Sequence, residues 1–147
     1  MALMKKYNLA ILTFAILLGG VGNTSFSAPT SLSASSFSGH YELADEKADR
    51  SFSLDVTQTG SSADLFFSAA MADGSGAAPD GDGHGKIDAG GVLSFTFKDS
   101  FDNEGSGTFE SKKDGYHLHL NVTKVIEPRP LRFYGDVLLK KTSSKPQ

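Results

Sequence analysis

The chain has 147 residues, a formal net charge of −3, 16 glycines, 11 phenylalanines, and neither cysteine nor tryptophan. This length is typical of a single domain. The lack of cysteine excludes a disulfide scaffold, a thiolate metal site, a cysteine nucleophile and a lipid-modified N-terminal cysteine. The acidic balance argues against nucleic acid or an anionic membrane surface as the main partner.

Residues 1–27 have the pattern of a secretory signal peptide. Two lysines near the start precede an apolar run at residues 9–18. That run is shorter than the roughly 20 apolar residues that a membrane-spanning helix needs. The small side chain of Ser27 predicts cleavage before Ala28. We therefore expect an exported protein, either periplasmic or secreted.

Cleavage at that point leaves 120 residues with 12 basic and 17 acidic side chains, a net charge of −5. An exported chain without disulfides must take its stability from a hydrophobic core, and 120 residues are enough for one. This composition suits a bacterial protein better than a small extracellular animal domain. We expect a flexible lead-in at residues 28–38, a single β domain at residues 39–141 and a disordered tail at residues 142–147.

The domain shows the two-residue hydrophobic alternation of β-strands and no helical periodicity. In the stretch from 92 to 98, for example, Leu93, Phe95 and Phe97 alternate with polar side chains. The clear strand segments are residues 50–58, 63–71, 92–98, 116–124 and 131–140, and the weaker ones are residues 39–43, 85–89 and 105–111.

Short glycine-containing turns separate these segments. The Asp114-Gly115 pair is a favoured two-residue hairpin loop, and glycine at residues 60, 90 and 91 supplies the positive φ that tight turns need. Pro128 and Pro130 predict an extended crossing segment before the last strand. The sequence thus predicts an all-β fold of about eight antiparallel strands in a meander. A small barrel and a two-sheet sandwich both fit, and so do a monomer and a homodimer, since a sandwich leaves edges that can pair.

One glycine-rich stretch resembles the start of an EF-hand calcium loop. Alternating carboxylates on a tight turn can supply several of the six to eight oxygens that calcium prefers. The match is partial, because His84 and Gly91 stand where further oxygen ligands belong. A polar loop between two strands is the alternative. The carboxylates of this weak calcium candidate are Asp80, Asp82 and Asp88. We expect no other cofactor.

His117 and His119 lie two residues apart and therefore project from the same strand face. Such a pair can hold zinc or copper when a neighbouring strand adds a third ligand. Solvated surface histidines are the alternative. Enzymatic motifs are missing: the chain has no G-x-S-x-G elbow, no H-E-x-x-H pair and no phosphate-binding glycine loop followed by a helix. We therefore expect a protein that is not an enzyme.

Two Ser-Gly-x-aromatic tetrapeptides are the remaining motif. They are Ser38-Gly39-His40-Tyr41 and Ser106-Gly107-Thr108-Phe109. With these, the chain resembles the periplasmic lysozyme inhibitors of Gram-negative bacteria, which are small exported all-β proteins. The resemblance implies a loop that enters the lysozyme cleft, where its serine and tyrosine hydroxyls bond the catalytic carboxylates. The second tetrapeptide departs from the pattern because phenylalanine lacks the hydroxyl, and the first lies earlier in the chain than the resemblance implies.

Several hypotheses follow from these features. The first is a non-enzymatic exported protein that binds a protein partner, a lysozyme among the candidates, with Ser38, Gly39, Tyr41, Ser106, Gly107 and Phe109 at the interface. Alternatively, the glycines of the tetrapeptides relieve crowding between strands and the aromatic rings fill the core. A calycin-like barrel around a small apolar ligand and a calcium-dependent surface module are the other candidates.

Overall fold

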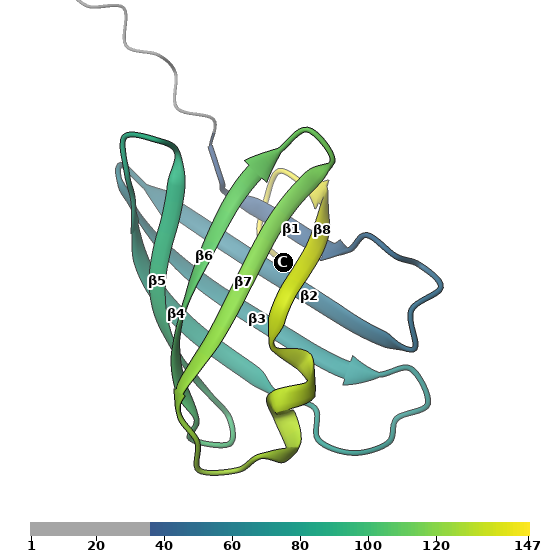
Figure 1. Ribbon diagram of the computed structural model, residues 1–147. Helices are drawn as coiled ribbons and strands as arrows, with labels where there is room; N and C mark the ends of the chain where they lie inside the picture. The colour runs from purple at the N-terminus through teal and green to yellow at the C-terminus, as the bar shows by residue number, and fades with distance from the viewer. Residues whose placement is uncertain (1–35) are drawn as a thin grey trace, which may run out of the picture. The chain divides into compact units, whose positions relative to one another are not determined.

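The computed structural model describes residues 36–147, so the predicted signal peptide and most of the predicted lead-in lie outside the described residues. Eight antiparallel strands follow one another around a closed barrel, and the last strand pairs with the first (Figure 1). The strands are β1 (Gly39–Leu43), β2 (Arg50–Thr59), β3 (Ser62–Met71), β4 (Asp80–Ile87), β5 (Val92–Asp99), β6 (Glu104–Lys112), β7 (Gly115–Lys124) and β8 (Gly135–Ser143). The prediction of an eight-stranded antiparallel meander is confirmed, and the barrel replaces the sandwich.

Alternating side chains make the wall of the barrel. In β5, Leu93, Phe95 and Phe97 are at most 4% exposed and point inward, while the residues between them face solvent. The same alternation holds in β3, where Leu65 and Phe67 point inward. Each strand therefore has one apolar face, and closure of the sheet brings all the apolar faces into one core.

Glycine backbones and phenylalanine rings fill the interior together. A Cβ placed on Gly81 of β4 would lie 2.2 Å from the ring of Phe67, and one on Gly107 of β6 would lie 2.5 Å from the ring of Phe95. These glycines face inward and make room for large neighbours, as in other small barrels that alternate small and large residues. The inward side chains of Leu54, Phe67, Phe95 and Leu120 are each at most 4% exposed, and they line none of the hollows described below or the hollow beside Phe52.

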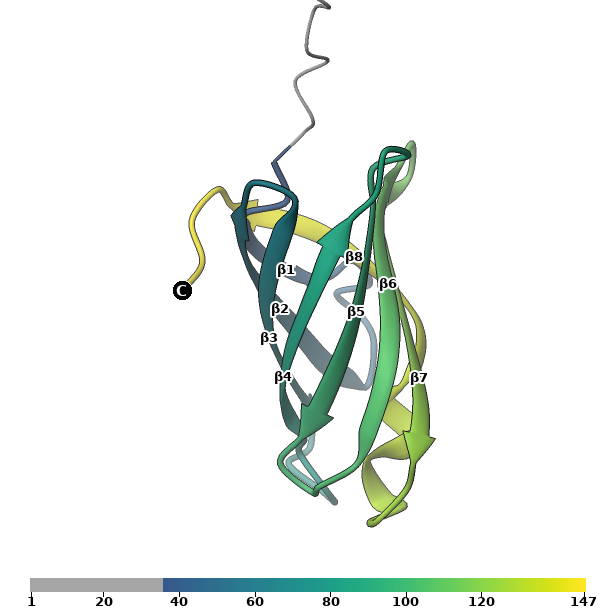
Figure 2. The same ribbon diagram turned by 90° about the vertical axis from the view of Figure 1, so that its left-hand side faces the viewer.

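The barrel has two different ends (Figure 2). At one end the connections are short turns at residues 60–61, 88–91 and 113–114, which we call the tight-turn end. At the other end the connections are residues 44–49, 72–79, 100–103 and 125–134, which we call the long-loop end. The last of these contains a short 3₁₀ helix, η1 (Arg129–Phe133). No helix in the described part of the chain is both long and apolar enough to cross a bilayer.

The predicted last strand began too early. Residues 131–133 belong to η1, and β8 starts only at Gly135. Pro130 explains the difference, because its fixed φ suits the first turn of a helix, and Pro128 itself has helical φ and ψ instead of the extended conformation that we predicted. At the other boundary β8 continues to Ser143, two residues beyond the predicted end of the domain.

The predicted fourth strand was placed too late. The structure has a strand at Asp80–Ile87, where the sequence predicted a polar loop followed by a strand at residues 85–89. Three of its residues are glycines, which have low strand propensity. The strand forms because β3 and β5 pair with it along both sides and because the inward glycines fit under the phenylalanine rings. Packing with the neighbours therefore overrides the local preference.

Candidate functional site

The second tetrapeptide lies in the middle of β6 and does not form a loop. Phe109 is completely buried, and Gly107 faces inward against the ring of Phe95. Ser106 is half-buried on the outer face, between Thr96 of β5 and Asn121 of β7. Of the residues predicted from this tetrapeptide, Ser106 alone presents its side chain to solvent.

The first tetrapeptide makes internal contacts. The Ser38 hydroxyl accepts a hydrogen bond from the Gln58 backbone N–H at 2.9 Å. Gly39 has φ +150° and pairs with Val56 of β2. Tyr41 is fully buried and donates to the Phe37 carbonyl at 2.6 Å. Burial raises the pKa of the Tyr41 phenol well above its usual value. The hydroxyl is therefore a structural group in this fold.

The two tetrapeptides meet through their aromatic rings inside the barrel. The ring centroids of Tyr41 and Phe109 lie 5.0 Å apart in an edge-to-face arrangement. Their serines do not meet, because Ser38 contacts Gln58 whereas Ser106 lies between β5 and β7. The structure thus joins the parts of the motif that fill the core and separates the parts that could face a partner.

The three carboxylates of the calcium candidate are also separated. Asp80 and Asp82 project from the outer face of β4, two residues apart. Asp88 lies in the turn after β4, where its side chain accepts a hydrogen bond from the Val92 N–H at 2.9 Å. Within residues 36–147 no group of three histidine or carboxylate side chains is arranged to hold a metal ion.

Charge is distributed unevenly along the chain. Residues 51–97, which form β2 to most of β5, contain six aspartates and one lysine. Residues 98–147 contain nine basic and seven acidic side chains. The net charge of −5 predicted for the mature protein therefore equals the charge of the first segment alone. An excess of one sign on one part of the surface attracts partners of the opposite sign.

An exposed aromatic side chain lies among these carboxylates. Phe66 of β3 is 43% exposed on the outer face. It pairs in register with Asp55 of β2 on one side and with Asp82 of β4 on the other. Asp64, two residues before it, lies on the same face and forms a 2.6 Å hydrogen bond with His84. We call Asp55, Asp64, Phe66, Asp80 and Asp82 the acidic face. These residues belong to β2, β3 and β4, which lie side by side in Figure 2.

A hollow of about 730 Å³ borders the acidic face. Two ion pairs neutralise much of its far side: Lys98 with Asp102 at 2.7 Å, and Lys124 with Glu104 at 2.9 Å. The lysine of each pair lowers the pKa of its carboxyl partner. The polar side chains that line the hollow are Asp64, Asp82, His84, Thr96, Lys98, Glu104 and Thr123. Asp64 and Asp82 form no ion pair with a lysine or arginine within the described residues, although Lys98 stands opposite Asp82 on β5.

Sequence reasoning missed Phe66. The predicted strand at residues 63–71 did not single out this side chain, which stands at an outward position between the buried Leu65 and Phe67. The signal was present, because two consecutive phenylalanines in a strand cannot both face the core. What the sequence alone could not show was that β2 and β4 place a carboxylate on each side of the exposed ring.

Comparison of the chain with models of known protein families, with curated proteins and with solved structures gives no match.

Proposed function

We propose that this chain is an exported, non-enzymatic binding protein that engages a basic protein through its acidic face. The observation that carries the proposal is the position of Phe66, a large exposed ring with Asp55 and Asp82 paired on either side of it. Aromatic side chains surrounded by polar groups are typical anchors of protein interfaces. The carboxylates add attraction for a cationic surface, which acts mainly on the rate of association.

The interior of the barrel offers less support for binding. The ring centroids of Phe67 and Phe97 are 5.5 Å apart, and those of Phe52 and Phe67 are 5.8 Å apart. Rings at these distances are in contact, so an apolar ligand would have to displace them. A site on the outer surface needs no such rearrangement. The outer surface is therefore the better candidate for recognition.

A lysozyme is the specific partner that we propose to test first. Two observations support it: the resemblance in the Ser-Gly-x-aromatic motif, and the match between an acidic face and a basic enzyme. The buried positions of Tyr41 and Phe109 suggest a mode of binding different from the loop insertion that the resemblance implies. Here Ser106, paired with Thr96 at the border of the hollow, and the acidic face would make the contacts.

The test measures protection of bacterial cells against several lysozyme types in a turbidity assay, with binding measured in parallel by surface plasmon resonance. We expect binding that weakens as salt rises, because salt screens exposed charges. The Asp64→Asn/Asp82→Asn variant should slow association about fivefold or more, as expected when steering charges are lost. Phe66→Ser should mainly accelerate dissociation.

Asp136→Asn is the matched control. Asp136 is exposed and bonded to a histidine, like Asp64, but it lies on β8 outside the acidic face. The Asp136→Asn variant should bind the lysozyme as the wild type does. If no lysozyme type binds, the lysozyme assignment fails. If one binds and the acidic-face variants bind it as well as the wild type does, the acidic face is not the interface.

A further inference from the structure

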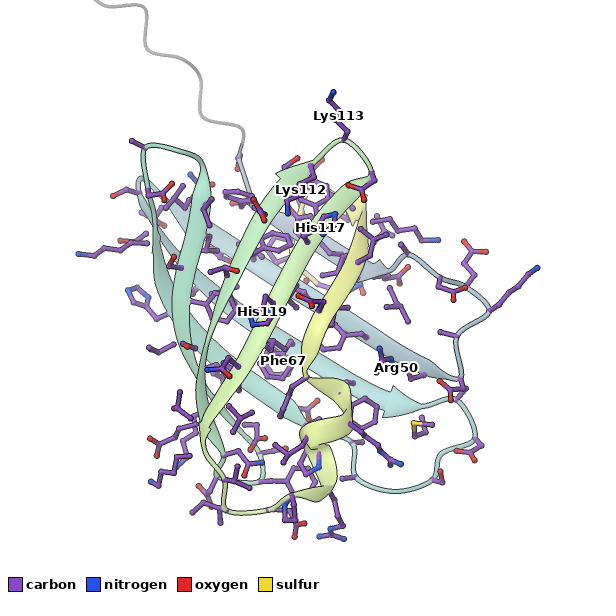
Figure 3. All side chains as sticks on the ribbon, in the orientation of Figure 1. Arg50, Phe67, Lys112, Lys113, His117 and His119 are labelled. Atoms are coloured by element: carbon purple, nitrogen blue, oxygen red, sulfur yellow. The ribbon has the colours of Figure 1, made fainter. Side chains whose placement is uncertain are left out.

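Two histidines on β7 form a cluster that the proposed function does not use. His117 and His119 both project from the outer face of this strand (Figure 3). They line one hollow of about 260 Å³ together with Glu110, Lys112 and Asp136, and Lys112 is paired with Glu110 at 2.7 Å. Their side chains are 36% and 52% exposed, so an ion from solution can reach them.

A carboxylate orients each imidazole ring. His119 Nδ1 lies 2.8 Å from an oxygen of Asp136, which stands directly opposite on β8. His117 Nε2 lies 2.9 Å from an oxygen of Asp114 in the preceding turn. The other nitrogen of each ring, Nε2 of His119 and Nδ1 of His117, has no hydrogen-bond partner within residues 36–147. Metal-ligating histidines usually donate one ring N–H to a carboxylate or carbonyl and bind the metal through the other nitrogen. Both histidines have the carboxylate in place and the second nitrogen available.

The spacing allows both free nitrogens to bind one ion. Residues two apart on a strand are about 6.7 Å apart along it, and a metal–imidazole bond is about 2.0 Å long. Because both side chains are exposed, the rings can pivot about their hydrogen bonds to Asp114 and Asp136, and we expect this motion to bring both free nitrogens to a common ion without moving the backbone. Because no three ligating side chains converge in the described part of the chain, water would complete the coordination.

We infer that His117 and His119 form a two-histidine site for a divalent transition-metal ion, with Cu²⁺ bound most tightly. Imidazole suits copper, and a given nitrogen site binds Cu²⁺ more tightly than the other divalent ions of the first transition row. The tetragonal geometry of Cu²⁺ accommodates two adjacent nitrogens, with water in the other positions. The hydrogen bonds that the ring N–H groups donate to Asp114 and Asp136 increase the basicity of the rings. This site is independent of the acidic face.

The test titrates the full chain with Cu²⁺ alone and follows it by calorimetry and by electron paramagnetic resonance. The wild type should bind one Cu²⁺ with the spectrum of two nitrogen ligands. His117→Asn and His119→Asn should each weaken that binding about tenfold or more and remove one nitrogen from the spectrum, since each variant leaves one imidazole. Asp136→Asn should have a smaller effect in the same direction, because it removes an orienting group and keeps both ligands.

His84→Asn is the matched control. His84 is exposed and bonded to Asp64 at 2.6 Å, but it has no second histidine two residues away. It should leave the high-affinity Cu²⁺ site unchanged. Thermal melts of each variant without metal check that the barrel is folded. The inference is overturned if the wild type shows no two-nitrogen Cu²⁺ spectrum, if His117→Asn and His119→Asn bind as the wild type does, or if His84→Asn weakens binding equally.

Discussion

The two ends of the barrel are closed by different chemistry. At the tight-turn end, Phe37 packs over the opening with its ring 5.3 Å from that of Phe109. Tyr41 joins the same cluster, with its ring 4.8 Å from that of Tyr116. We call Phe37, Tyr41, Phe109 and Tyr116 the aromatic plug. Its one internal side-chain hydrogen bond runs from the Tyr41 hydroxyl to the Phe37 carbonyl.

At the long-loop end a hydrogen-bonded cluster replaces the rings. Asn103 is completely buried, and its side-chain oxygen accepts from the backbone N–H groups of Ile126 and Glu127 at 2.7 and 2.9 Å. Its side-chain nitrogen donates to Asp99, which is only 4% exposed, and to the Glu127 carbonyl. The Tyr134 hydroxyl also donates to Asp99. We call Asp99, Asn103 and Tyr134 the polar clamp.

The difference follows from the length of the connections. Short turns leave few backbone groups to satisfy, so apolar rings can cover that end. Longer connections bring many backbone N–H and C=O groups toward the core, and buried polar groups need partners. Within residues 36–147 no buried side-chain nitrogen or oxygen is without one. The polar clamp supplies partners to the connection at residues 125–134 and thereby fixes the loop that carries the exposed Val125 and Ile126.

The largest loss of stability should come from a substitution in the aromatic plug. Phe37→Ala removes a ring that is 2% exposed, and truncation of a buried phenylalanine costs about 4 kcal/mol of the free energy of unfolding. Urea denaturation measures the loss. Phe66→Ala is the control, because that ring is 43% exposed and its loss should cost less than about 1 kcal/mol. Equal effects of the two substitutions would show that Phe37 does not close the barrel.

The second-largest loss of stability should come from a substitution in the polar clamp. Asn103→Ala leaves Asp99 and two backbone N–H groups with fewer partners, and we expect a loss of about 3 kcal/mol. Hydrogen exchange at Ile126 and Glu127 should accelerate, because their N–H groups lose their acceptor. Asn121→Ala, an exposed asparagine on β7, should change neither quantity. Unchanged exchange in the Asn103 variant would contradict the role of the clamp.

Alkaline pH should weaken both ends. Burial raises the pKa of Tyr41, and burial together with Asp99 raises the pKa of Tyr134. Above about pH 10 the unfolded chain loses these phenolic protons while the folded chain keeps them. The two phenols therefore do not reduce the free energy of unfolding below pH 10, and they lower it progressively above pH 10. Tyr41 and Tyr134 each account for at most about 1.4 kcal/mol per pH unit of this decline.

Two variants assign that decline to its source. Tyr41→Phe and Tyr134→Phe should each make the free energy of unfolding less dependent on pH between 10 and 11.5. Denaturant titrations across this range provide the measurement. If the free energy of unfolding of both variants declines with pH as steeply as that of the wild type, groups other than these two tyrosines cause the decline.

The smallest effect should come from an exposed ion pair at the long-loop end. Lys98 and Asp102 lie 2.7 Å apart next to the polar clamp, but both side chains are more than half exposed. Pairs of this kind add little to stability. Lys98→Ala should therefore leave the urea midpoint unchanged within error, in contrast to Asn103→Ala one residue after Asp102. A large shift would mean that the turn depends on this pair and not on the clamp alone.

The sequence predicted the tight-turn end far better than the long-loop end. Gly60, Gly91 and Gly115 have the positive φ that their turns require, and they lie where turns were expected. Such turns depend on one or two residues, which a sequence displays directly. The long-loop end depends on Asn103, whose partners are 23 and 24 residues away. No local pattern identifies such a contact, and the helical turn around Pro130 was accordingly read as extended.

The candidate site was predicted only in part. The outward direction of Ser106 could be read from alternation, and so could the shared face of His117 and His119. The acidic face could not, because it depends on the register that places Asp55, Phe66 and Asp82 side by side across three strands. Register follows from how the closed barrel fits together, and a one-residue shift would put each of these side chains on the other face.

Closure of the barrel through β1 and β8 also governs how the chain can fold. His40 pairs with Ser143, so the pairing of β1 with β8 joins residues about 100 positions apart in the sequence. Closing a loop of that length is entropically costly before other contacts exist, so we expect this pairing to form late. A chain cut before residue 135 would retain β1–β7 with two unpaired edges, at β1 and β7, each able to pair with another copy. The final nine-residue strand thus covers both of these edges as it completes the wall of the barrel.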